Sequence, residues 1–339
     1  MQIKRWLMMI GLFAMGLGTW LHAGTVREEQ AKMGSPFEIT AVHDDPALAR
    51  VAITAAWAEI DRLEAMISSW QETSQTSAVN RNAGVAPVPV SPELFGLIRR
   101  ALKVSKLTGG AFDISFASAG RFWDFRTGKL PEPAVVAQAV RAIDYRKIQL
   151  KPDQQTVYLD GKGTRIGFGA IGKGYAANRA LHILKQYGIA HALVNAGGDL
   201  VATGQQEDGK PWAIAIAHPR QPGQLLARLN LTEQAVVTSG DYERFFMHEG
   251  KRYTHIIDPR TGYPVEGVMS VTVICPDAEL ADALATSVFV LGRKDGLNLI
   301  NRLARVESIV VTADGQVHYS RNMQQQLVQT VNPQKEPSK

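Results

Sequence analysis

Gly167-Phe-Gly-Ala-Ile-Gly-Lys-Gly174 is the stretch of sequence that decides between the possible folds. It matches the pattern G-x-G-x-x-G and stands between a predicted strand and a predicted helix, as the dinucleotide-binding loop of a Rossmann fold does. The next predicted strand, Ala192-Leu-Val, ends in Asn195, so no acidic residue is available there to bind a ribose hydroxyl. The chain also lacks the repeated βαβαβ order of that fold. A Rossmann domain is therefore not expected.

The same stretch nearly matches the phosphate-binding loop G-x-x-x-x-G-K-[ST]. Gly174 stands where that loop needs a hydroxyl to hold Mg²⁺. Small residues and a lysine before a helix still expose backbone amides that can bind a phosphate. Glycine clusters also serve close packing alone. The stretch by itself favours neither interpretation.

Hydrophobic periodicity outside this stretch predicts an α+β fold. Apolar residues recur at helical spacing in 45–69, 91–108, 131–142, 174–187 and 278–291. Strands are expected at 33–42, 148–150, 156–159, 165–166, 192–194, 200–201, 212–217, 225–231, 235–238, 252–257 and 271–274, with a hairpin of 308–312 and 316–319. The polar stretch from Gln71 to Asn82 suggests a surface loop. Because helices and strands come in blocks with many hairpins, we expect mainly antiparallel sheets with packed helices.

The first residues have the pattern of an export signal. Lys4 and Arg5 precede an uncharged run, 6–21, that ends at His22-Ala23. The run is short for a membrane span and is interrupted by glycines, so we expect cleavage after Ala23. It holds no cysteine for a lipid anchor. The expected organisation is a signal peptide, 1–23, one domain, 24–330, built as one unit or as two intertwined sub-domains, and a polar tail, 331–339. The protein is expected in the periplasm.

Charge and cysteine content exclude several classes of function. The net charge is +5, and removal of Lys4 and Arg5 with the leader would leave +3. Without a cluster of basic residues, this mild excess does not indicate nucleic-acid binding. The single cysteine, Cys275, cannot form an internal disulfide, and cysteine ligation of a metal is not expected.

Asp282-Ala-Leu-Ala-Thr286 is a candidate metal site. The two polar residues are four apart in a predicted helix and therefore share one face. A carboxylate and a hydroxyl are hard oxygen ligands that suit Mg²⁺ or Ca²⁺. Two ligands are too few, so backbone carbonyls or substrate phosphates must complete the shell. An aspartate near a helix start also acts as a cap, and spacing alone favours the cap.

A third cluster, Thr254-His255-Ile-Ile-Asp258-Pro-Arg-Thr-Gly262, joins a strand end to a turn. His255 is well placed there for acid–base chemistry, or for bracing the turn by hydrogen bonds. Asp258 before a proline is equally an ordinary turn residue. The hydroxyls of Thr238-Ser-Gly-Asp-Tyr242 could face a phosphate or belong to a turn.

The order of these motifs is more specific than any one of them. Along the chain stand Met33-Gly-Ser35, Ser69-Trp70, Ser77-Ala-Val-Asn80, Gly110-Ala-Phe-Asp113, Gly169-Ala-Ile-Gly-Lys-Gly-Tyr175, Asn195-Ala-Gly-Gly-Asp199, Thr238-Ser-Gly-Asp-Tyr242, His255-Ile-Ile-Asp-Pro-Arg-Thr-Gly262 and Ala281-Asp-Ala-Leu-Ala-Thr286. The series resembles the ApbE family of FAD:protein FMN transferases over essentially the whole chain after the leader. The resemblance implies an ApbE-like fold related to the T-fold.

The resemblance also implies ligands and roles. Mg²⁺ is expected on Asp282 and Thr286, with carbonyl oxygens from Ala170 and Ala285. FAD is expected to contact Met33, Trp70, Ala111, Phe112, Asp113, Lys173 and Ile257. His255, or a nearby carboxylate such as Asp258, would take the proton of a Thr or Ser hydroxyl on an acceptor protein, in the family's setting an envelope electron-transfer protein. FMN would be attached to that hydroxyl and AMP released.

Three positions depart from the family pattern. Gly167 and Asn178 stand where the family usually or often has Asp, and Trp70 replaces a common Tyr but keeps an aromatic surface. The loss of an Asp at Gly167 removes one expected flavin contact. Two alternatives to an enzyme therefore stay open. One is a non-enzymatic FAD carrier for a respiratory complex, and the other is a scaffold protein with a degenerate site.

Overall fold

An eight-stranded antiparallel sheet organises the structure. The computed structural model describes residues 24–221, 223–325, 327 and 329–330, so the predicted leader and tail lie outside the described residues. All neighbouring strands of the sheet pair antiparallel, in the order β1-β2-β6-β7-β10-β13-β14-β15. Their bounds are Gly24–Lys32 (β1), Ser35–His43 (β2), His191–Ala196 (β6), Asp199–Thr203 (β7), Gln234–Gly240 (β10), Val268–Cys275 (β13), Glu307–Thr312 (β14) and Val317–Tyr319 (β15).

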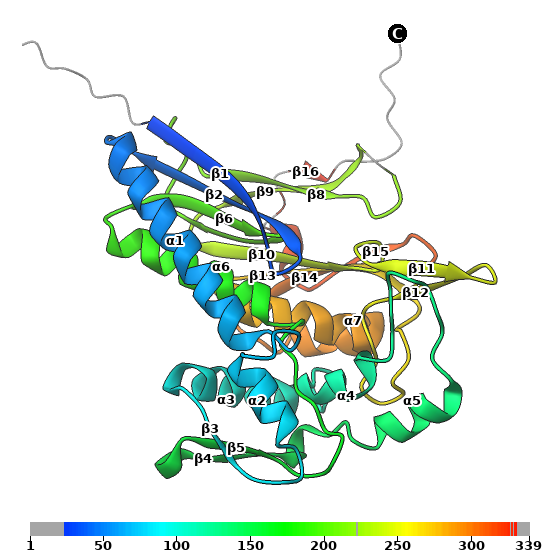
Figure 1. Cartoon of the computed structure of the whole chain (residues 1–339). Helices are drawn as coiled ribbons and strands as arrows, with labels where there is room; N and C mark the ends of the chain where they lie inside the picture. Colours follow the sequence, from blue (N-terminus) through cyan, green and yellow to red (C-terminus); the bar gives the residue numbers. More distant parts are fainter. Residues whose placement is uncertain (1–23, 222, 326, 328, 331–339) are drawn as a thin grey trace, which may run out of the picture.

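Both faces of this sheet are covered (Figure 1). Three helices, α1 (Pro46–Ile67), α6 (Gly172–Gln186) and α7 (Ala278–Ile300), pack on one face. A small sheet of β8 (Trp212–Ala217), β9 (Leu225–Leu231) and β16 (Gln329–Thr330) covers the other with inward side chains such as Trp212 and Ile214. The structure confirms the α+β class with mainly antiparallel sheets.

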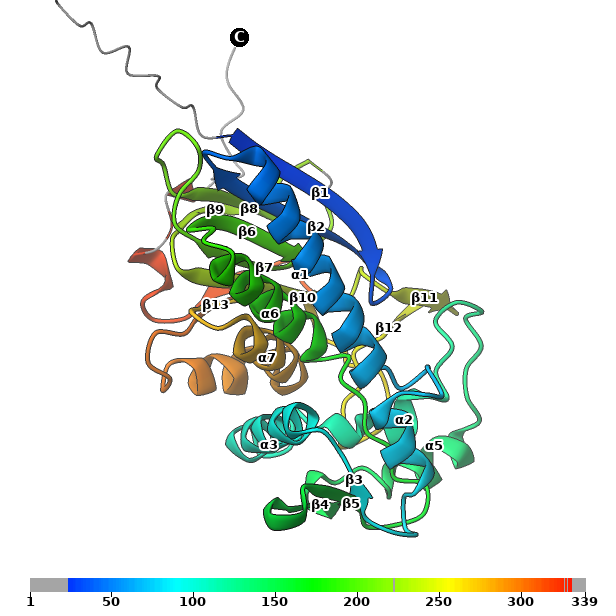
Figure 2. The ribbon, with the colours of Figure 1, turned by 60° about the vertical axis from the view of Figure 1, so that its left-hand side comes forward.

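Most of the remaining elements form a second body beside the helical face (Figure 2). They are α2 (Gln75–Arg81), α3 (Pro92–Leu107), α4 (Ala117–Gly120), α5 (Pro133–Val140) and a sheet of β3 (Val88–Pro89), β4 (Ile148–Lys151) and β5 (Thr156–Leu159). The hairpin of β11 (Phe245–His248) and β12 (Lys251–Thr254) lies at one end of the main sheet (Figure 1). Short 3₁₀ turns lie at Ile114–Phe116, Tyr145–Lys147, Pro152–Gln154 and Met323–Gln325. The described part of the chain contains no helix that is both long and apolar enough to cross a membrane.

Side-chain caps fix the helix starts that the sequence predicted. Asp45 accepts hydrogen bonds from Ala47 N at 2.8 Å and Leu48 N at 3.3 Å at the start of α1, and Ser91 accepts from Leu94 N at 3.2 Å at the start of α3. The predicted end of the last helix at Leu291 is confirmed as a break, because Gly292 has φ of 76°. A second helical segment then continues to Ile300.

The prediction of a surface loop at 71–82 was wrong. Ser74 caps α2 by accepting a hydrogen bond from Ser77 N at 2.9 Å, and Asn80 is buried. The Asn80 amide donates to the Ile166 carbonyl at 2.9 Å and accepts from Ile166 N at 2.8 Å. Both backbone groups of Ile166 are therefore satisfied by a side chain. For this reason the strand predicted at 165–166 does not form, although the chain there runs buried and bonded.

Other strand predictions need smaller corrections. The first predicted strand, 33–42, is β2, and Met33 lies in the preceding turn with φ of 50°. Strand β1 was missed because Val26 is its only buried residue and the rest is polar. Strand β11 was missed as well, and the strand predicted at 252–257 ends at Thr254, where the chain turns toward the cavity described next.

Candidate active site

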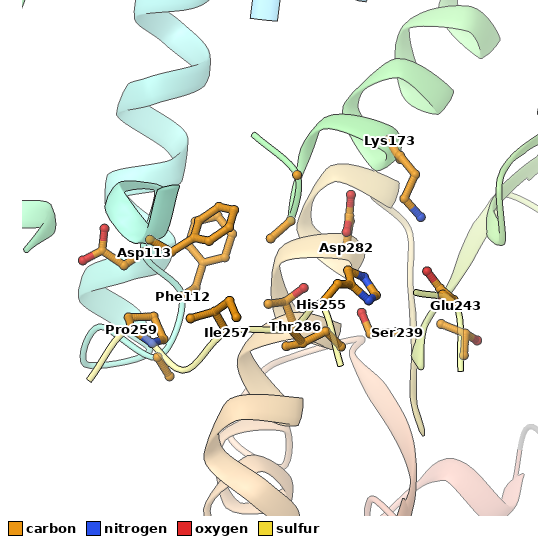
Figure 3. Close-up of a pocket in the computed structure, with 16 residues that line it drawn as sticks. Phe112, Asp113, Lys173, Ser239, Glu243, His255, Ile257, Pro259, Asp282 and Thr286 are labelled. Carbon is orange, nitrogen blue, oxygen red and sulfur yellow. The ribbon is translucent and has the colours of Figure 1, made fainter. Parts of the chain in front are cut away.

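A cavity lies where the N-terminal ends of α6 and α7 meet the end of β10 and the chain after β12 (Figure 3). About 660 Å³ of space lies between its walls, including the part open to solvent. It is lined by Ala111, Phe112, Asp113, Phe116, Gly169, Ala170, Lys173, Thr238, Ser239, Glu243, His255, Ile256, Ile257, Pro259, Asp282 and Thr286. Figure 3 shows Phe112, Ile257 and Pro259 at one end, and Lys173, Asp282 and Glu243 at the other. The cavity therefore has an apolar end and a polar end.

Close contact of α6 with α7 forms the polar end. A Cβ atom on Gly174 would lie 2.1 Å from the Ala278 carbonyl oxygen and 2.9 Å from Asp282 Cβ, so only glycine permits this approach. Gly174 N donates to Asp282 Oδ2 at 3.1 Å. Burial raises the pKa of Asp282 well above its ordinary value. Thr286 follows one turn later on the same face of α7 and also lines the cavity.

Lys173 is held by a buried aspartate from the neighbouring strand. Its Nζ lies 3.2 Å from Asp199 Oδ1 and 3.4 Å from the Gly197 carbonyl oxygen. Burial raises the pKa of Asp199 to about 6, against the opposing effect of Lys173. Burial also opposes the charge of Lys173, but nearby carboxylates, Asp199 first, outweigh it and raise the pKa of the lysine. Within the described residues Asp199 Oδ2 is buried and has no hydrogen-bond partner.

His255 faces the cavity as a neutral imidazole. Its Nδ1 lies 3.2 Å from the Arg244 carbonyl oxygen, which can only accept, so Nδ1 carries the proton and Nε2 keeps a free lone pair. Burial lowers the pKa of His255 to about 4 against the opposing hydrogen bond to the Arg244 carbonyl, and the charges of Arg244 and Lys173 lower it further. At neutral pH Nε2 is therefore unprotonated and can accept a hydrogen bond from a hydroxyl.

Hydrophobic side chains form the other end. Phe112 and Ile257 are buried, at 1% and 5% exposure, and Phe116 and Pro259 complete the wall. Such a surface suits a flat aromatic ring system. One cavity thus combines an apolar end with an end rich in ionisable groups.

Comparison with known proteins identifies the family of the chain. The family model described as "ApbE family" matches residues 33–310. The chain belongs to the ApbE family. An FAD:protein FMN transferase of Treponema pallidum is 32% identical over 286 residues, 79% of each chain, and one of Klebsiella pneumoniae is 33% identical over 284 residues, 83% of this chain and 87% of that one.

Solved ApbE structures share the fold. The ApbE protein of Thermotoga maritima matches with a TM-score of 0.84 and 29% identity, covering 90% of this chain and 100% of that one. The apo form of the Pseudomonas stutzeri flavinyl transferase ApbE matches with a TM-score of 0.81 and 27% identity, covering 91% and 98%. The predicted family and its fold are thereby confirmed.

The structure brings most of the site residues predicted from the ApbE resemblance to one cavity. These are Ala111, Phe112, Asp113, Ala170, Lys173, His255, Ile257, Asp282 and Thr286. The Asp113 carboxylate already accepts three hydrogen bonds from within the protein, from Ser115 N at 2.8 Å, Ser115 Oγ at 2.6 Å and Tyr145 N at 2.7 Å. Asp113 therefore caps a turn of the cavity wall, and its carboxylate is directed away from the polar end in Figure 3.

Four predicted residues do not line the cavity. Asp258 forms an ion pair with Arg260 at 2.7 Å and accepts backbone bonds within its turn, which is the turn role left open by the sequence. Ala285 is buried in α7. Met33 donates its N–H to Glu64 at 3.0 Å, and Trp70 is 84% exposed. Contacts of Met33 and Trp70 with FAD, and of Ala285 with a metal, stay predictions.

Several residues of the site were missed from the sequence. Ser239 lines the cavity, and Asp199 lies behind the cavity wall, where it holds Lys173. Both stood inside motifs that the sequence singled out, Asn195–Asp199 and Thr238–Tyr242, so these stretches were the available signal. Glu243 directly follows the second stretch, and Phe116 stands in a turn without a motif. Only the pairing of β7 with β10, which aligns Asp199 with Val237, places Asp199 beside this wall.

Two of the three departures from the family pattern, Gly167 and Asn178, can be interpreted in the structure. A Cβ on Gly167 would lie 3.2 Å from Ala117 Cβ, so a larger side chain there requires a small shift of the neighbouring turn. Asn178 donates to Asp277 Oδ1 at 2.8 Å and accepts from Ala278 N at 3.1 Å. An amide suits this place because it both donates and accepts. Asn178 therefore ties α6 to the start of α7.

Proposed function

We propose that this chain transfers FMN from FAD to a Thr or Ser hydroxyl of an acceptor protein, with the help of Mg²⁺, and releases AMP. The observation that carries the proposal is the single cavity in which Asp282, Thr286 and Lys173 stand opposite an aromatic-binding wall. Membership of the ApbE family supports flavin transfer, because the relatives compared above are named FAD:protein FMN transferases.

The donor set at the polar end fits a divalent cation. Asp282 offers a carboxylate, Thr286 a hydroxyl and Ala170 a backbone carbonyl, which are hard ligands of the kind Mg²⁺ prefers. Asp199, Asp282 and Glu243 add three carboxylates around one ammonium group, that of Lys173. Burial raises the pKa of Asp282 and of Asp199, so a bound cation would also stabilise the charged form of these carboxylates. Bound Mg²⁺ would supply charge neutralisation for the diphosphate and for the leaving phosphate.

The chain's own residues supply the remaining chemistry. Nε2 of His255 takes the proton from the acceptor hydroxyl, whose oxygen then forms a bond to the phosphorus of the FMN half. The bond between that phosphorus and the bridging oxygen breaks, and AMP leaves with the bridging oxygen. The ammonium group of Lys173, which lines the cavity, stabilises the negative charge that develops. The wall of Phe112 and Ile257 orients the aromatic half of the substrate.

The proposal also includes the cellular location of the protein, which is argued from its first 23 residues. The leader of residues 1–23 has the pattern of a cleaved signal peptide without a lipid-anchoring cysteine. We therefore place the enzyme in the periplasm, where its acceptor would be an envelope electron-transfer protein.

The test is incubation of the purified protein with FAD and MgCl₂. Release of AMP is followed by chromatography, and envelope proteins are searched by mass spectrometry for an FMN-sized addition. Asp282→Ala and Thr286→Ala should abolish both signals, EDTA should mimic them, and the surface control Asp153→Ala should have no effect. Full activity of Asp282→Ala would remove the metal site from the proposal. FAD binding with no AMP and no modified protein would instead favour the carrier function.

A further inference from the structure

The β11–β12 hairpin begins and ends at the wall of the cavity. Glu243, two residues before β11, and His255, directly after β12, both line the cavity. The hairpin itself extends to the edge of the molecule in Figure 1. A protein segment bound along the hairpin would therefore lie directly beside the point where a hydroxyl must enter.

The two faces of the hairpin differ. On one face Phe246 and Tyr253 stack at 5.2 Å between ring centroids, and Tyr253 packs on Trp123 at 6.0 Å. On the other face Phe245 is 37% and Met247 is 55% exposed. Packing of the face with Phe246 and Tyr253, the inner face, against Trp123 holds the hairpin on the rest of the protein. Nothing in the described residues explains why the outer face carries two large apolar side chains.

The outer face is also cationic. Arg252, which pairs with Met247 across the strands, places its guanidinium 3.8 Å from the centroid of the Phe245 ring. In the described part of the chain Arg252 forms no ion pair, and its hydrogen bond goes to the Asp241 carbonyl oxygen at 3.5 Å. The neighbouring Lys251, by contrast, pairs with Glu266 at 2.6 Å. The face thus offers an apolar surface with an uncompensated positive charge.

Backbone groups add a way to bind an extended segment. The two strands form a sheet of their own, joined by a turn at Glu249 and Gly250 with φ of 48° and 75°. His255 N donates to the Arg244 carbonyl oxygen at 3.0 Å. In an antiparallel pair the residues alternate between bonding to the partner strand and pointing away from it. The N–H and C=O groups of Phe245 and Met247 therefore point away from β12, toward the free edge of the hairpin. An extended peptide can pair with such an edge while its side chains rest on the outer face.

We propose that the acceptor protein docks on the face formed by Phe245, Met247 and Arg252, and that its docking segment is extended and carries an acidic side chain that meets Arg252. The proposal rests on the flavin-transfer function above. It assigns recognition of the protein substrate to the hairpin, and recognition of FAD to the cavity. The two substrates thereby approach the reacting phosphorus from different sides of His255.

The test uses the acceptor protein that gains an FMN-sized mass in the experiment above. For Arg252→Glu we expect the acceptor KM to rise about tenfold, because a rim charge at an interface is reversed, and the increase should shrink at high salt. Met247→Ser should raise the same KM several-fold, and Arg252→Gln should give an intermediate value. Arg99→Glu on α3 and Val51→Ser on α1 are matched controls on exposed positions of other elements, and should leave the KM unchanged. Release of AMP from FAD without acceptor, and the thermal unfolding midpoint, should stay as in the wild type for every variant.

An acceptor KM within twofold of the wild type for both Arg252→Glu and Met247→Ser would overturn the docking proposal. If the same variants also lose binding to vesicles of anionic phospholipid, the face is assigned to a membrane surface instead. Both outcomes leave flavin transfer intact. Failure of the wild-type protein to modify any acceptor, by contrast, refutes the proposed function itself. A charge reversal of the acidic side chain in the acceptor should restore transfer by Arg252→Glu and thereby identify the contact.

Discussion

Substitution of Gly174 by alanine tests the helix contact on which the polar end of the cavity depends. The new Cβ would lie 2.1 Å from the Ala278 carbonyl oxygen, whereas ordinary contacts begin at 3.4 Å, so α6 and α7 must separate by about 1 Å. Overpacking against a backbone that cannot rotate away costs about 3 kcal/mol, at the upper end of the usual range. Alanine regains about 1 kcal/mol in helix propensity. The expected net loss of about 2 kcal/mol corresponds to a fall in Tm of about 4–8 °C.

The same displacement moves Asp282 relative to the Ala170 carbonyl. A misplacement of about 1 Å in a catalytic site reduces the rate about 100-fold, so AMP release should fall by that order. Thermal unfolding and AMP release are measured on the same preparation. Gly96→Ala is the matched control, because its Cβ would meet only the Arg100 guanidinium at 3.5 Å and should stabilise α3 slightly. A Gly174→Ala protein with wild-type Tm and wild-type AMP release would show that the two helices do not approach as closely as described.

Three further predictions concern single side chains of the site. Burial lowers the pKa of His255 to about 4, so the ring should stay neutral down to about pH 4. Histidine NMR spectra measure this, and the resonance that disappears in His255→Gln identifies the ring. The histidine of the unfolded chain binds this proton at a higher pH than the folded protein does. His255 therefore contributes stability that is present above about pH 6.5 and lost as the pH falls through 4. Titration of the His255 ring near pH 6.5 in the folded protein would contradict its burial. Lys173→Met leaves Asp199 and Asp282 without their cation, so the free energy of unfolding should fall by about 3–5 kcal/mol. In a thermal-shift assay MgCl₂ should restore part of this loss. An unaltered Tm would contradict the ion pair. Trp70→Ala should raise the Kd for FAD about tenfold, because the exposed indole is expected to stack on the flavin or the adenine. The stability of the free protein should not change. An unchanged Kd in a fluorescence titration would exclude that contact.

The sequence predicted elements whose signals are local. Helices α1 and α3 carry both periodic apolar residues and a capping side chain, and they begin where expected. Strand β1 was invisible because it lies at an edge of the sheet and buries only Val26. The stretch at Ile166 was misjudged for a different reason. Its alternation is that of a strand, but its hydrogen bonds go to Asn80, which stands 86 residues away in the sequence.

The site could be predicted only through the resemblance to a family. Spacing alone favoured a helix cap for Asp282, and in the structure the cap of α7 is Asp277, which accepts from Leu280 N at 3.1 Å. Asp282 is therefore free to face the cavity. Periodicity could not reveal this, because it depends on the angle at which α6 crosses α7. Asp258 shows the opposite case, since its neighbour Arg260 binds the carboxylate within the turn.

Gly167–Gly174 carries both of the roles that its sequence left open. Its last glycine allows the close helix contact, and its Ala170 and Lys173 line the cavity. The two roles are physically linked, because Gly174 N donates to Asp282 Oδ2 only when the helices are in contact. A hydroxyl at position 174, as in a phosphate-binding loop, would require a Cβ atom and would separate them. The glycine that argued against one nucleotide-binding loop is thus the residue that makes this site possible.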